Sequence, residues 1–589
     1  MSLVRCRALL AVAPRVPLRS YATISSQISS DHDVVIIGGG IAGLALGASL
    51  STNPATSHLK TALVEASDLD KIQAWKPKED EWTNRISSVT NENRRWLHDI
   101  GAWSFVDPKR TCPIEEMQVW DSLSDSRLTL TSPRPEYMST LVENFNLQHS
   151  LLKLIKEKGK NIELLGGRKV ESIEAGVAGG WPTLKLQGDR NLRARLIVGA
   201  DGLRSPARQF AGIPSHGHSY DTHTIVSVMS HHPYPPLPPG YSHTYTAFQR
   251  FLPSGPLAFL PLGESRASLA WHIRTPELSK AVKSLEGNGL AELVNACFRL
   301  PEHGIEMILQ RILEASRKAS SAITTSATTT TQAEPFITRE EINQLIALVE
   351  RSSGKVEPHS ALSMIHPPSP LGIPPADHHL VPPMITSFQP RMTASFPLAY
   401  SHAETYISVS HRVVLVGDAA HTVHPHAGMG LNLGLLDVRA LTRTIESALN
   451  VGGDLGSSVS LKPYERERWI ENQKVLSVTD GLEKVFRVKS PLLKWIRGTG
   501  IDILEQLDGV KGLLINQSGG TPSTLTDSRG YPSRPSNPTS SSVVPSLGQF
   551  VSDLTKASGG LKQVAELAGG IAGRALRGAV DGALNSRRR

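Results

Sequence analysis

Residues 31–50 of the chain read DHDVVIIGGGIAGLALGASL. After three polar residues, the stretch has four β-branched residues, 34–37, as a buried strand does, and it continues into an Ala- and Leu-rich helical pattern. Between them lie three glycines at the spacing G-x-G-x-x-G: Gly38, Gly40 and Gly43. Glycine at these positions allows a tight turn and a close approach of the backbone to a pyrophosphate, which the N-terminus of the helix would face. The stretch therefore predicts a Rossmann-like, dinucleotide-binding α/β domain.

The segment that follows strengthens this interpretation. A lone glycine fingerprint is weak, because glycine-rich turns also occur in α/β proteins that bind no dinucleotide. Here the next strand-like segment, TALVE, ends in Glu65, at the distance where an acid would hold a ribose hydroxyl pair. A membrane span over residues 34–50 would be interrupted by its glycines, so we expect strand, turn and helix, and no membrane span.

The composition is that of a soluble globular protein with more than one domain. The chain has 589 residues, of which 39% are hydrophobic and 20% charged, enough to bury a large core. It has three cysteines, Cys6, Cys112 and Cys297, which form neither a disulfide framework nor a cysteine-based metal set. So few cysteines fit a reducing compartment.

The N-terminal stretch, residues 1–26, has the pattern of a mitochondrial transit peptide. It contains Arg5, Arg7, Arg15 and Arg19, and no acid precedes Asp31. The sequence RSYA predicts cleavage near Tyr21. A secretory signal is the alternative, but the apolar run 8–13 is short and is followed by proline and arginine. Removal of four arginines would take much of the formal net charge of +8, which argues against nucleic-acid binding.

Two downstream stretches indicate which dinucleotide is bound. RLIVGADGLRSPAR (195–208) and RVVLVGDAAHTVHPHAGMGLNLGLLDVRAL (412–441) each read as a buried strand that ends at a Gly/Asp pair before a helix. Together with the N-terminal fingerprint they resemble the flavoprotein aromatic hydroxylases, which bind FAD. Further segments, among them NRISSVT, EMQVWDS, AFQRFLPSGPLAFLPL and SFPLAYSHAETY, resemble the monooxygenases of mitochondrial coenzyme Q (ubiquinone) biosynthesis. The resemblance covers about residues 30–275 and 390–490.

The resemblance implies a role for each matching residue. Glu65 would bind the adenosine ribose, Arg85 would lie along the flavin, and Asp418 would hold the ribityl hydroxyls. Asp201 belongs to the family's second Gly/Asp motif, which serves FAD and the approach of a reductant, and Gln148 would contact the flavin on a looser match. The remaining cofactor contacts would come from the last motif, at Gly417, Gly430, Leu431 and Asn432. Of these, Leu431 and Asn432 would contact the isoalloxazine edge through their backbone.

The last motif also raises the question of a metal, because it contains His421, His424 and His426. These histidines lack a Cys or carboxylate partner at metal-site spacing other than Asp418, which the flavin interpretation already uses, so we expect no metal. The helix that starts within HAGMGLNLG would instead direct its amide N–H groups at the flavin. Met429 departs from the family pattern, which has glutamine there, so one polar contact near the cofactor is in doubt.

The resemblance implies an FAD-dependent monooxygenase that uses O₂ to hydroxylate C5 of a polyprenylated hydroxybenzoate-type ring in ubiquinone biosynthesis. One complete fingerprint leaves no second dinucleotide-binding fold for NADPH, so either NADPH binds transiently, as in many aromatic hydroxylases, or a protein donates the electrons. The family resemblance favours ferredoxin with its reductase. It also implies a multi-subunit coenzyme Q synthesis complex and a peripheral position on the matrix side of the mitochondrial inner membrane. No spacing singles out a protein general base. A soluble NADPH-dependent phenol hydroxylase and a flavin-free scaffold of that complex are the alternatives.

The expected fold is α/β, with a Rossmann-like FAD-binding domain and an inserted β-sheet substrate domain of the aromatic hydroxylase type. Two segments between the motifs are of biased composition: 316–334 is Ser/Thr-rich and 365–383 is proline-rich. We therefore expect a transit peptide over 1–21, FAD-binding parts over 30–215 and 401–515, a substrate domain over 216–400 with an insertion at 316–334, and a linker and basic tail over 516–589.

Overall fold

The computed structural model describes residues 29–78, 81–122, 127–131, 137–177, 180–234, 245–287, 289–325, 336–352, 380–423 and 428–487. All of these lie in one compact unit. The expected transit peptide, the C-terminal linker and tail, and most of the proline-rich segment lie outside the described residues. Across the part of the chain that the structure describes, no helix is both long and apolar enough to cross a membrane.

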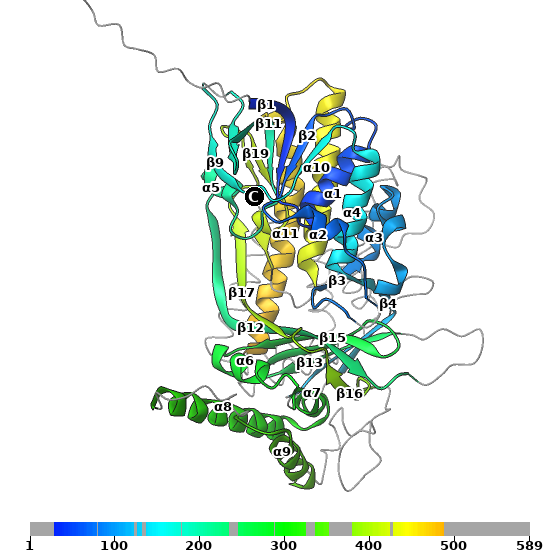
Figure 1. Cartoon of the computed structure of the whole chain (residues 1–589), viewed down its shortest axis with the longest axis vertical. Helices are drawn as coiled ribbons and strands as arrows, with labels where there is room; N and C mark the ends of the chain where they lie inside the picture. The colour runs from blue at the N-terminus through cyan, green and yellow to red at the C-terminus, as the bar shows by residue number, and fades with distance from the viewer. Residues whose placement is uncertain are drawn as a thin grey trace, which may run out of the picture. The chain divides into compact units, whose positions relative to one another are not determined.

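The first sheet is the predicted Rossmann-like one (Figure 1). Within the described ranges it has eight strands, with the path β18–β19–β11–β1–β2–β8 and with β10 and β9 continuing from β11. The pairings of β1 with β2 and β11, of β2 with β8, and of β11 with β19 are parallel. The strands are β1 (Ser29–Ile37), β2 (Thr61–Val64), β8 (Ile162–Leu165), β9 (Val170–Glu174), β10 (Thr183–Leu186), β11 (Arg190–Gly199), β18 (Ile407–Ser408) and β19 (Val413–Leu415).

Helix α1 (Ile41–Thr52) is buried along residues 43–51, because α4 and α10 pack on it as well as the sheet. Its alanines and glycines suit this position, since small side chains let neighbouring helices approach closely. Figure 1 shows α1 and α4 beside strands β1 and β2. The helices of this part are α1, α2 (Leu69–Gln73), α3 (Asn91–Asp99), α4 (Asn144–Lys158), α5 (Pro206–Phe210), α10 (Met429–Asn450) and α11 (Ser458–Arg487), with 3₁₀ turns at Trp103–Phe105, Pro108–Arg110 and Gly417–Ala419.

The second sheet is largely antiparallel and confirms the predicted β-sheet domain. Over the described residues it has nine strands in the path β20–β17–β12–β15–β14–β13–β5–β6, with β16 beside β12. The strands are β5 (Glu116–Asp121), β6 (Arg127–Thr131), β12 (Ser215–His231), β13 (Thr246–Leu252), β14 (Gly255–Pro261), β15 (Arg266–Ile273), β16 (Ile385–Phe388), β17 (Ala394–Ala403) and β20 (His421–Thr422).

The second sheet draws strands from outside the range 216–400. Strands β5 and β6 come from within 30–215, and β20 comes from within 401–515. Strand β5 pairs in parallel with β13. This long-range pairing brings β5 and β6 into the second sheet, and local sequence patterns do not indicate it. The ranges assigned to the FAD-binding parts therefore contain three strands of the substrate sheet.

The two faces of the second sheet pack differently. One face is covered by helices whose core includes Trp271, Phe259 and Phe298, all with no exposed surface. The other face packs against a three-stranded sheet, β3 (Ile86–Thr90), β7 (Ser139–Glu143) and β4 (Thr111–Ile114), through Val228 and its neighbours. The covering helices are α6 (Pro276–Lys283), α7 (Leu290–Arg299), α8 (Glu302–Thr325) and α9 (Arg339–Ser352).

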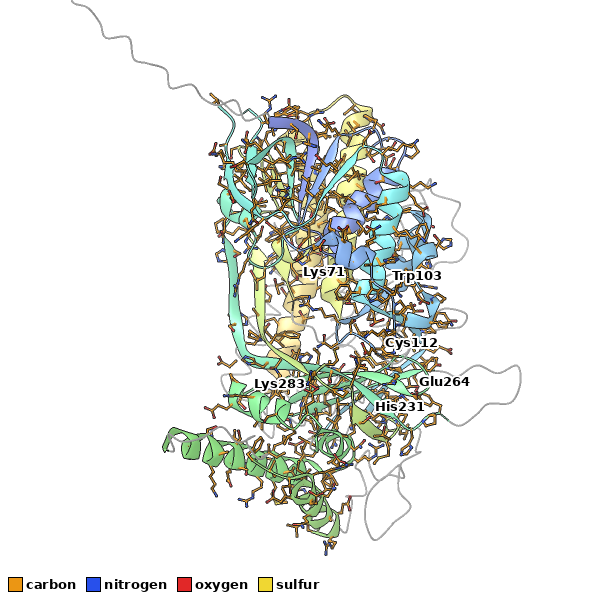
Figure 2. All side chains as sticks on the ribbon, in the orientation of Figure 1. Lys71, Trp103, Cys112, His231, Glu264 and Lys283 are labelled. Carbon is orange, nitrogen blue, oxygen red and sulfur yellow. The ribbon has the colours of Figure 1, made fainter. Side chains whose placement is uncertain are left out.

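Cys112 lies in the contact between the three-stranded sheet and the second sheet (Figure 2). Its side chain is 1% exposed, and burial raises the pKa of the thiol to about 12. A thiol that stays protonated and is shielded from solvent is a packing group rather than a nucleophile.

The Ser/Thr-rich segment is partly helical. Helix α8 continues to Thr325, so it includes residues 316–325, and Arg317 pairs with Glu277 of α6 at 2.5 Å. Serine and threonine tolerate helix when a preceding amphipathic stretch anchors the first turns, as the buried Ile308 and Ile312 do here. The rest of the predicted insertion, 326–334, lies outside the described residues.

Candidate functional site

The carboxyl ends of four neighbouring strands of the first sheet bring the predicted motifs together. Each strand leads into one motif: β1 into the glycine turn, β2 into Glu65, β11 into Asp201, and β19 into Gly417 and Asp418. Gly38 N–H donates to Val64 O and Ala200 N–H donates to Ile37 O, both at 2.8 Å, so the ends are joined by backbone hydrogen bonds. Ligands of open α/β sheets bind outside this edge.

The three fingerprint glycines have different surroundings. Gly38 has φ +112°, and a Cβ there would lie 2.3 Å from Ala200 O. A Cβ at Gly43 would lie 1.9 Å from Gly38 O, so this glycine is needed for packing α1 against the turn. Gly40 is the N-cap of α1, and a Cβ there would meet no atom within 4 Å. Gly40 is thus the position at which the backbone is open to a ligand.

Glu65 and Gln148 both contact this turn. Glu65 Oε2 accepts from Gly39 N–H at 2.5 Å, and Oε1 accepts from Ser67 N–H at 2.7 Å. Gln148, on α4, donates from Nε2 to Gly39 O at 3.3 Å. The structure therefore brings both predicted residues to the glycine turn. It adds Gly39, whose only sequence signal is its place between the first two fingerprint glycines.

Asp418 lies on the short turn after β19. Gly417, which precedes it, has φ +59°, a left-handed conformation that favours glycine. The Asp418 side chain is exposed, and no described residue donates a hydrogen bond to its carboxylate. Desolvation by the surrounding protein nevertheless raises its pKa, and the nearby His421 opposes that shift. As far as the described residues go, this exposed carboxylate can accept hydrogen bonds from a ligand's hydroxyl groups.

Helix α10 begins at Met429, within the stretch where the sequence predicts a helix start. Its N-cap, Gly428, is left-handed with φ +60°. The amide N–H groups of the first turn, which includes Gly430 and Leu431, have no acceptor within the helix and carry the positive end of its dipole. A Cβ at Gly430 would be in ordinary contact with Val423 at 3.6 Å, so the protein's own packing does not require glycine there.

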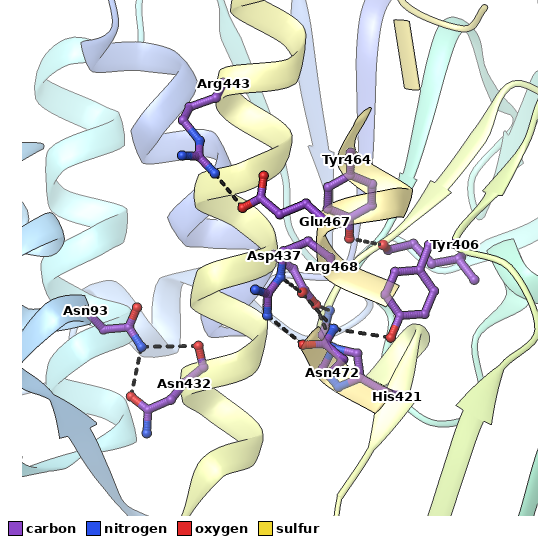
Figure 3. Close-up of polar contacts among 12 residues, drawn as sticks. Asn93, Tyr406, His421, Asn432, Asp437, Arg443, Tyr464, Glu467, Arg468 and Asn472 are labelled. Carbon is purple, nitrogen blue, oxygen red and sulfur yellow. Dashed lines mark hydrogen bonds and ion pairs between the residues drawn. The ribbon is translucent and has the colours of Figure 1, made fainter. Parts of the chain in front are cut away.

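The Asn432 side chain is used inside the protein. Its Nδ2 donates to Ser88 O at 2.7 Å, and its Oδ1 accepts from Thr90 N–H at 3.0 Å and from Asn93 Nδ2 at 2.9 Å. Figure 3 shows the Asn93–Asn432 contact. The side chain joins α10 to β3 and α3, and Asn93 Nδ2 also donates to the backbone oxygen of Asn432 at 3.1 Å. A contact of the Asn432 backbone with the flavin stays a prediction. Asn93 was not predicted, because nothing in its local sequence marks it.

Arg85 lies on the loop before β3, and its side chain is exposed. Glu143, which is fully buried, anchors this loop. Thr83 donates to the Glu143 carboxylate from its N–H at 2.7 Å and from Oγ1 at 3.0 Å. Arg110 pairs with the same carboxylate at 2.8 Å and stacks over Trp82 at 4.2 Å. Buried charges need such partners. The loop backbone is therefore fixed while Arg85 remains available.

Asp201 serves the local structure. Its Oδ2 accepts from Ala207 N–H at 3.0 Å at the start of α5, and burial raises the pKa of the carboxyl. In α5, Arg208 donates to Ala419 O at 2.6 Å, which ties the second Gly/Asp motif to the Asp418 turn. The placement of Asp201 at the ligand edge agrees with the prediction, and a contact with a cofactor stays a prediction.

Sequence reasoning missed Asp437, a fully buried carboxylate on α10 (Figure 3). Its Oδ2 accepts from Gly417 N–H at 3.0 Å and from His421 Nε2 at 2.6 Å. Its Oδ1 accepts from Arg468 Nε at 2.9 Å and from Asn472 Nδ2 at 3.0 Å. Burial alone would raise the pKa of Asp437, but His421 and Arg468 outweigh burial and hold it at about 2. An acid within the apolar run GLLDVRAL is the signal that could have found it.

The partner of His421 settles how this histidine is used. It is 1% exposed and bonded to Asp437, which agrees with packing and hydrogen bonding beside the cofactor edge. The residues that the structure describes contain no group of three or more His, Cys, Asp or Glu able to hold a metal ion. His424 and His426 lie outside those residues.

His402 is the cross-strand partner of His421 between β17 and β20. Its Nε2 lies 2.8 Å from the hydroxyl of Tyr406. Burial, and then the proximity of His421, lower the pKa of His402 to about 4. A neutral His402 can accept a hydrogen bond from the Tyr406 hydroxyl, whereas a protonated one would be a buried cation next to another histidine.

Comparison with known proteins identifies the chemistry of this edge. The FAD binding domain family matches residues 81–286 and 377–479. The chain is 33% identical over 515 residues to a protein of Saccharomyces cerevisiae named ubiquinone biosynthesis monooxygenase COQ6, mitochondrial, covering 86% of this chain and 97% of that one. The protein of the same name from Schizosaccharomyces pombe is 30% identical over 513 residues, covering 86% and 95%.

Solved structures share the fold. The probable FAD-dependent monooxygenase PqsL of Pseudomonas aeruginosa aligns with a TM-score of 0.50 at 17% identity, over 80% of this chain and all of that one. The p-nitrophenol 4-monooxygenase PnpA of Pseudomonas putida aligns with a TM-score of 0.51 at 14% identity, over 84% of this chain and all of that one. At such low identity the likeness concerns the architecture alone.

Two glycine substitutions should separate ligand binding from folding. Gly43→Ala places its Cβ against the backbone of Gly38, so we expect the free energy of unfolding to fall by about 1–3 kcal/mol or more. Gly40→Ala meets open space, so stability should stay within about 0.5 kcal/mol while FAD affinity falls, because the second fingerprint glycine allows the pyrophosphate to approach. Urea unfolding of the FAD-free protein and fluorescence titration with FAD measure the two effects. Equal stability loss in both variants would contradict the assignment.

His402 should make stability depend on pH. Because its folded pKa of about 4 lies below the ordinary value of 6.5, its contribution is present above pH 6.5 and is lost as pH falls toward 4. The variant His402→Gln keeps an acceptor for Tyr406 but lacks the titrating group. Its free energy of unfolding should therefore fall less than that of wild type across this pH window, by an amount on the order of 1–3 kcal/mol. The measurement is urea unfolding of both proteins at several pH values. A constant difference between them would contradict the prediction.

Proposed function

Because this chain belongs to the mitochondrial ubiquinone biosynthesis monooxygenases, a family of FAD-dependent enzymes, we propose that it hydroxylates C5 of a polyprenylated hydroxybenzoate-type ring with electrons delivered by a ferredoxin. The observation that carries the proposal is the meeting of the glycine turn, Glu65, Asp418 and the start of α10 at one sheet edge, in a chain that matches nearly the full length of those relatives.

The residues at this edge fit FAD part by part. The open position at Gly40 and the N-terminus of α1 suit the pyrophosphate, and Glu65, which contacts the glycine turn, would bind the adenosine ribose. The free carboxylate of Asp418 suits the ribityl hydroxyls. The first-turn amides of α10, at Gly430 and Leu431, would stabilise negative charge at the flavin edge. Bound FAD would supply the activation of O₂, and these residues would bind and orient it.

The second sheet offers a surface for an apolar substrate. Ala394, Val226, Ala270 and Ala258 stand in register across four strands, and all four are partly exposed. This row lies on the face that packs against the three-stranded sheet, because Val228, two residues from Val226, makes that contact. Strand β3 of the three-stranded sheet in turn contacts α10. A row of small apolar side chains near the cofactor edge suits a flat ring with a prenyl tail.

Phe396 extends this surface. It is opposite Thr224 in the pairing of β17 with β12, on the same face as the apolar row, and its side chain is 44% exposed. The Thr224 hydroxyl lies 2.7 Å from His272 Nδ1, which provides a polar pair next to the apolar residues. An apolar surface with one polar pair supports a phenolic substrate that carries a hydrocarbon tail.

The electron donor is proposed from the loop after β11. Leu203 and Arg204 are exposed there, next to Asp201 and at the same edge as the glycine turn. An exposed apolar side chain beside an exposed arginine suits a small acidic protein that docks by charge and contact.

We also propose that the protein lies on the matrix side of the mitochondrial inner membrane, within a multi-subunit quinone-synthesis complex, because the proposed substrate is a membrane lipid.

Asp418→Ala should abolish tight FAD binding. The substitution removes a charged acceptor for ribityl hydroxyls, worth about 1.5–3 kcal/mol, so we expect the Kd for FAD to rise about tenfold or more. Asp418→Asn keeps an acceptor and should lose less. Fluorescence titration of the FAD-free protein measures both. If the alanine variant is purified with full flavin occupancy, the assignment of Asp418 is wrong.

The source of electrons can be tested on the purified flavoprotein. NADPH alone should bleach the flavin's visible absorbance slowly in stopped flow, whereas ferredoxin with its reductase should reduce it far faster, with a gain that decreases as salt is added. Mass spectrometry of the product of a prenylated hydroxybenzoate should then show one added oxygen, and NMR of its aromatic protons should place that oxygen at C5. Reduction by NADPH alone at about 1–10³ per second would mean a self-sufficient phenol hydroxylase instead.

A further inference from the structure

Asp437 has no direct part in the function proposed above, yet its carboxylate accepts four hydrogen bonds. The donors belong to three separate segments: Gly417 in the turn that carries Asp418, His421 in β20, and Arg468 and Asn472 in α11. Figure 3 shows Asp437 with His421, Arg468 and Asn472. A carboxylate with four donors around it is saturated, so it has no capacity left to bind a ligand itself.

The position of these donors matters more than their number. After β19 the chain leaves the first sheet, makes the turn Gly417–Ala419, and enters the second sheet at β20. Asp437 Oδ2 holds both ends of this crossing, through the Gly417 amide and the His421 ring. Helix α10 lies directly against the turn, because a Cβ at Gly434 would be 3.4 Å from Gly417 Cα.

We propose that Asp437 is a positioning residue for the cofactor. It fixes the turn Gly417–Ala419 against α10, so that the Asp418 carboxylate and the first-turn amides of α10 are presented to the same ligand. The inference rests on the FAD placement proposed above. Its charge state suits the role, since, despite burial, His421 and Arg468 lower the pKa of Asp437 and so favour the ionised carboxylate that accepts from all four donors.

The alternative is that Asp437 only joins α10 to α11. The chain offers a matched control, because Arg443 of α10 and Glu467 of α11 form an ion pair at 2.6 Å between the same two helices. This pair is partly exposed, and its hydrogen bond runs from α10 to α11. If Asp437 contributed only to the packing of α10 against α11, Glu467→Gln and Asp437→Asn would both change the stability of that contact.

Asp437→Asn is the decisive variant. Asparagine has nearly the same shape, but its amide nitrogen would face donors on one side, either Gly417 and His421 or Arg468 and Asn472. We expect the Kd for FAD to rise about tenfold or more and the absorption bands of the residual bound flavin to lose definition, whereas Glu467→Gln should bind FAD as wild type does. Titrations are made at a temperature where near-ultraviolet circular dichroism shows each FAD-free protein to be folded.

A second pair of variants decides the matter if Asp437→Asn does not fold. His421→Gln keeps a donor near the position of Nε2, and His421→Leu removes it while retaining Asp437 and its other three donors. The leucine variant should bind FAD several-fold more weakly than the glutamine variant. Equal FAD affinity in these two proteins would overturn the inference.

Asp418→Ala serves as the reference, because it tests the proposed FAD placement itself. Loss of FAD binding in Asp418→Ala with wild-type binding in Asp437→Asn would overturn the positioning role and leave the placement intact. Tight FAD binding in Asp418→Ala would overturn the placement, and the positioning role with it. Loss of binding in both, with Glu467→Gln unaffected, supports the role.

Discussion

The two parallel pairings of strand β1 are the constraint on which the rest of the structure depends. Val35 stands between Ile197 of β11 and Ala62 of β2, and none of the three side chains is exposed. A shift of one residue would turn a whole buried set to the opposite face, so the register is strongly specified. This register sets the carboxyl ends of the strands side by side. The glycine turn, Glu65 and the Asp201 loop meet as a consequence.

A second constraint is that the chain crosses repeatedly between its two sheets. Strands β5 and β6 enter the second sheet early, β12 and β17 run along it, and β20 returns to it after β19. Single polar side chains hold these crossings. Gln389 exchanges two hydrogen bonds of 3.0 Å with the backbone of Trp82, Asn432 joins α10 to β3, and Asp437 holds the turn after β19. The cofactor edge and the substrate sheet are thus linked through a small number of buried polar groups, each of which is costly to leave unpaired.

The sequence alone determined the features that depend on neighbours along the chain. Gly38, Gly40 and Gly43 belong to one turn, and the strand, turn and helix around them are local, so the α/β fold and the dinucleotide edge could be predicted. The family resemblance added FAD and the monooxygenase activity in ubiquinone biosynthesis, and the comparisons confirm both. The start of α10 was also predictable, because a glycine-rich stretch directly precedes its apolar periodicity.

Only the tertiary structure decided which side chains face a ligand and which are used within the protein. Glu65 and Gln148 both hydrogen-bond to Gly39 although they come from different elements, and the side chain of Asn432 hydrogen-bonds to Asn93. Asp437 accepts hydrogen bonds from donors that lie up to 35 positions away in the sequence. Strands β5 and β6 join the second sheet through a long-range parallel pairing. Spacing along the chain carries no signal for such contacts, because they form only when buried polar groups from distant segments must satisfy one another in the folded core.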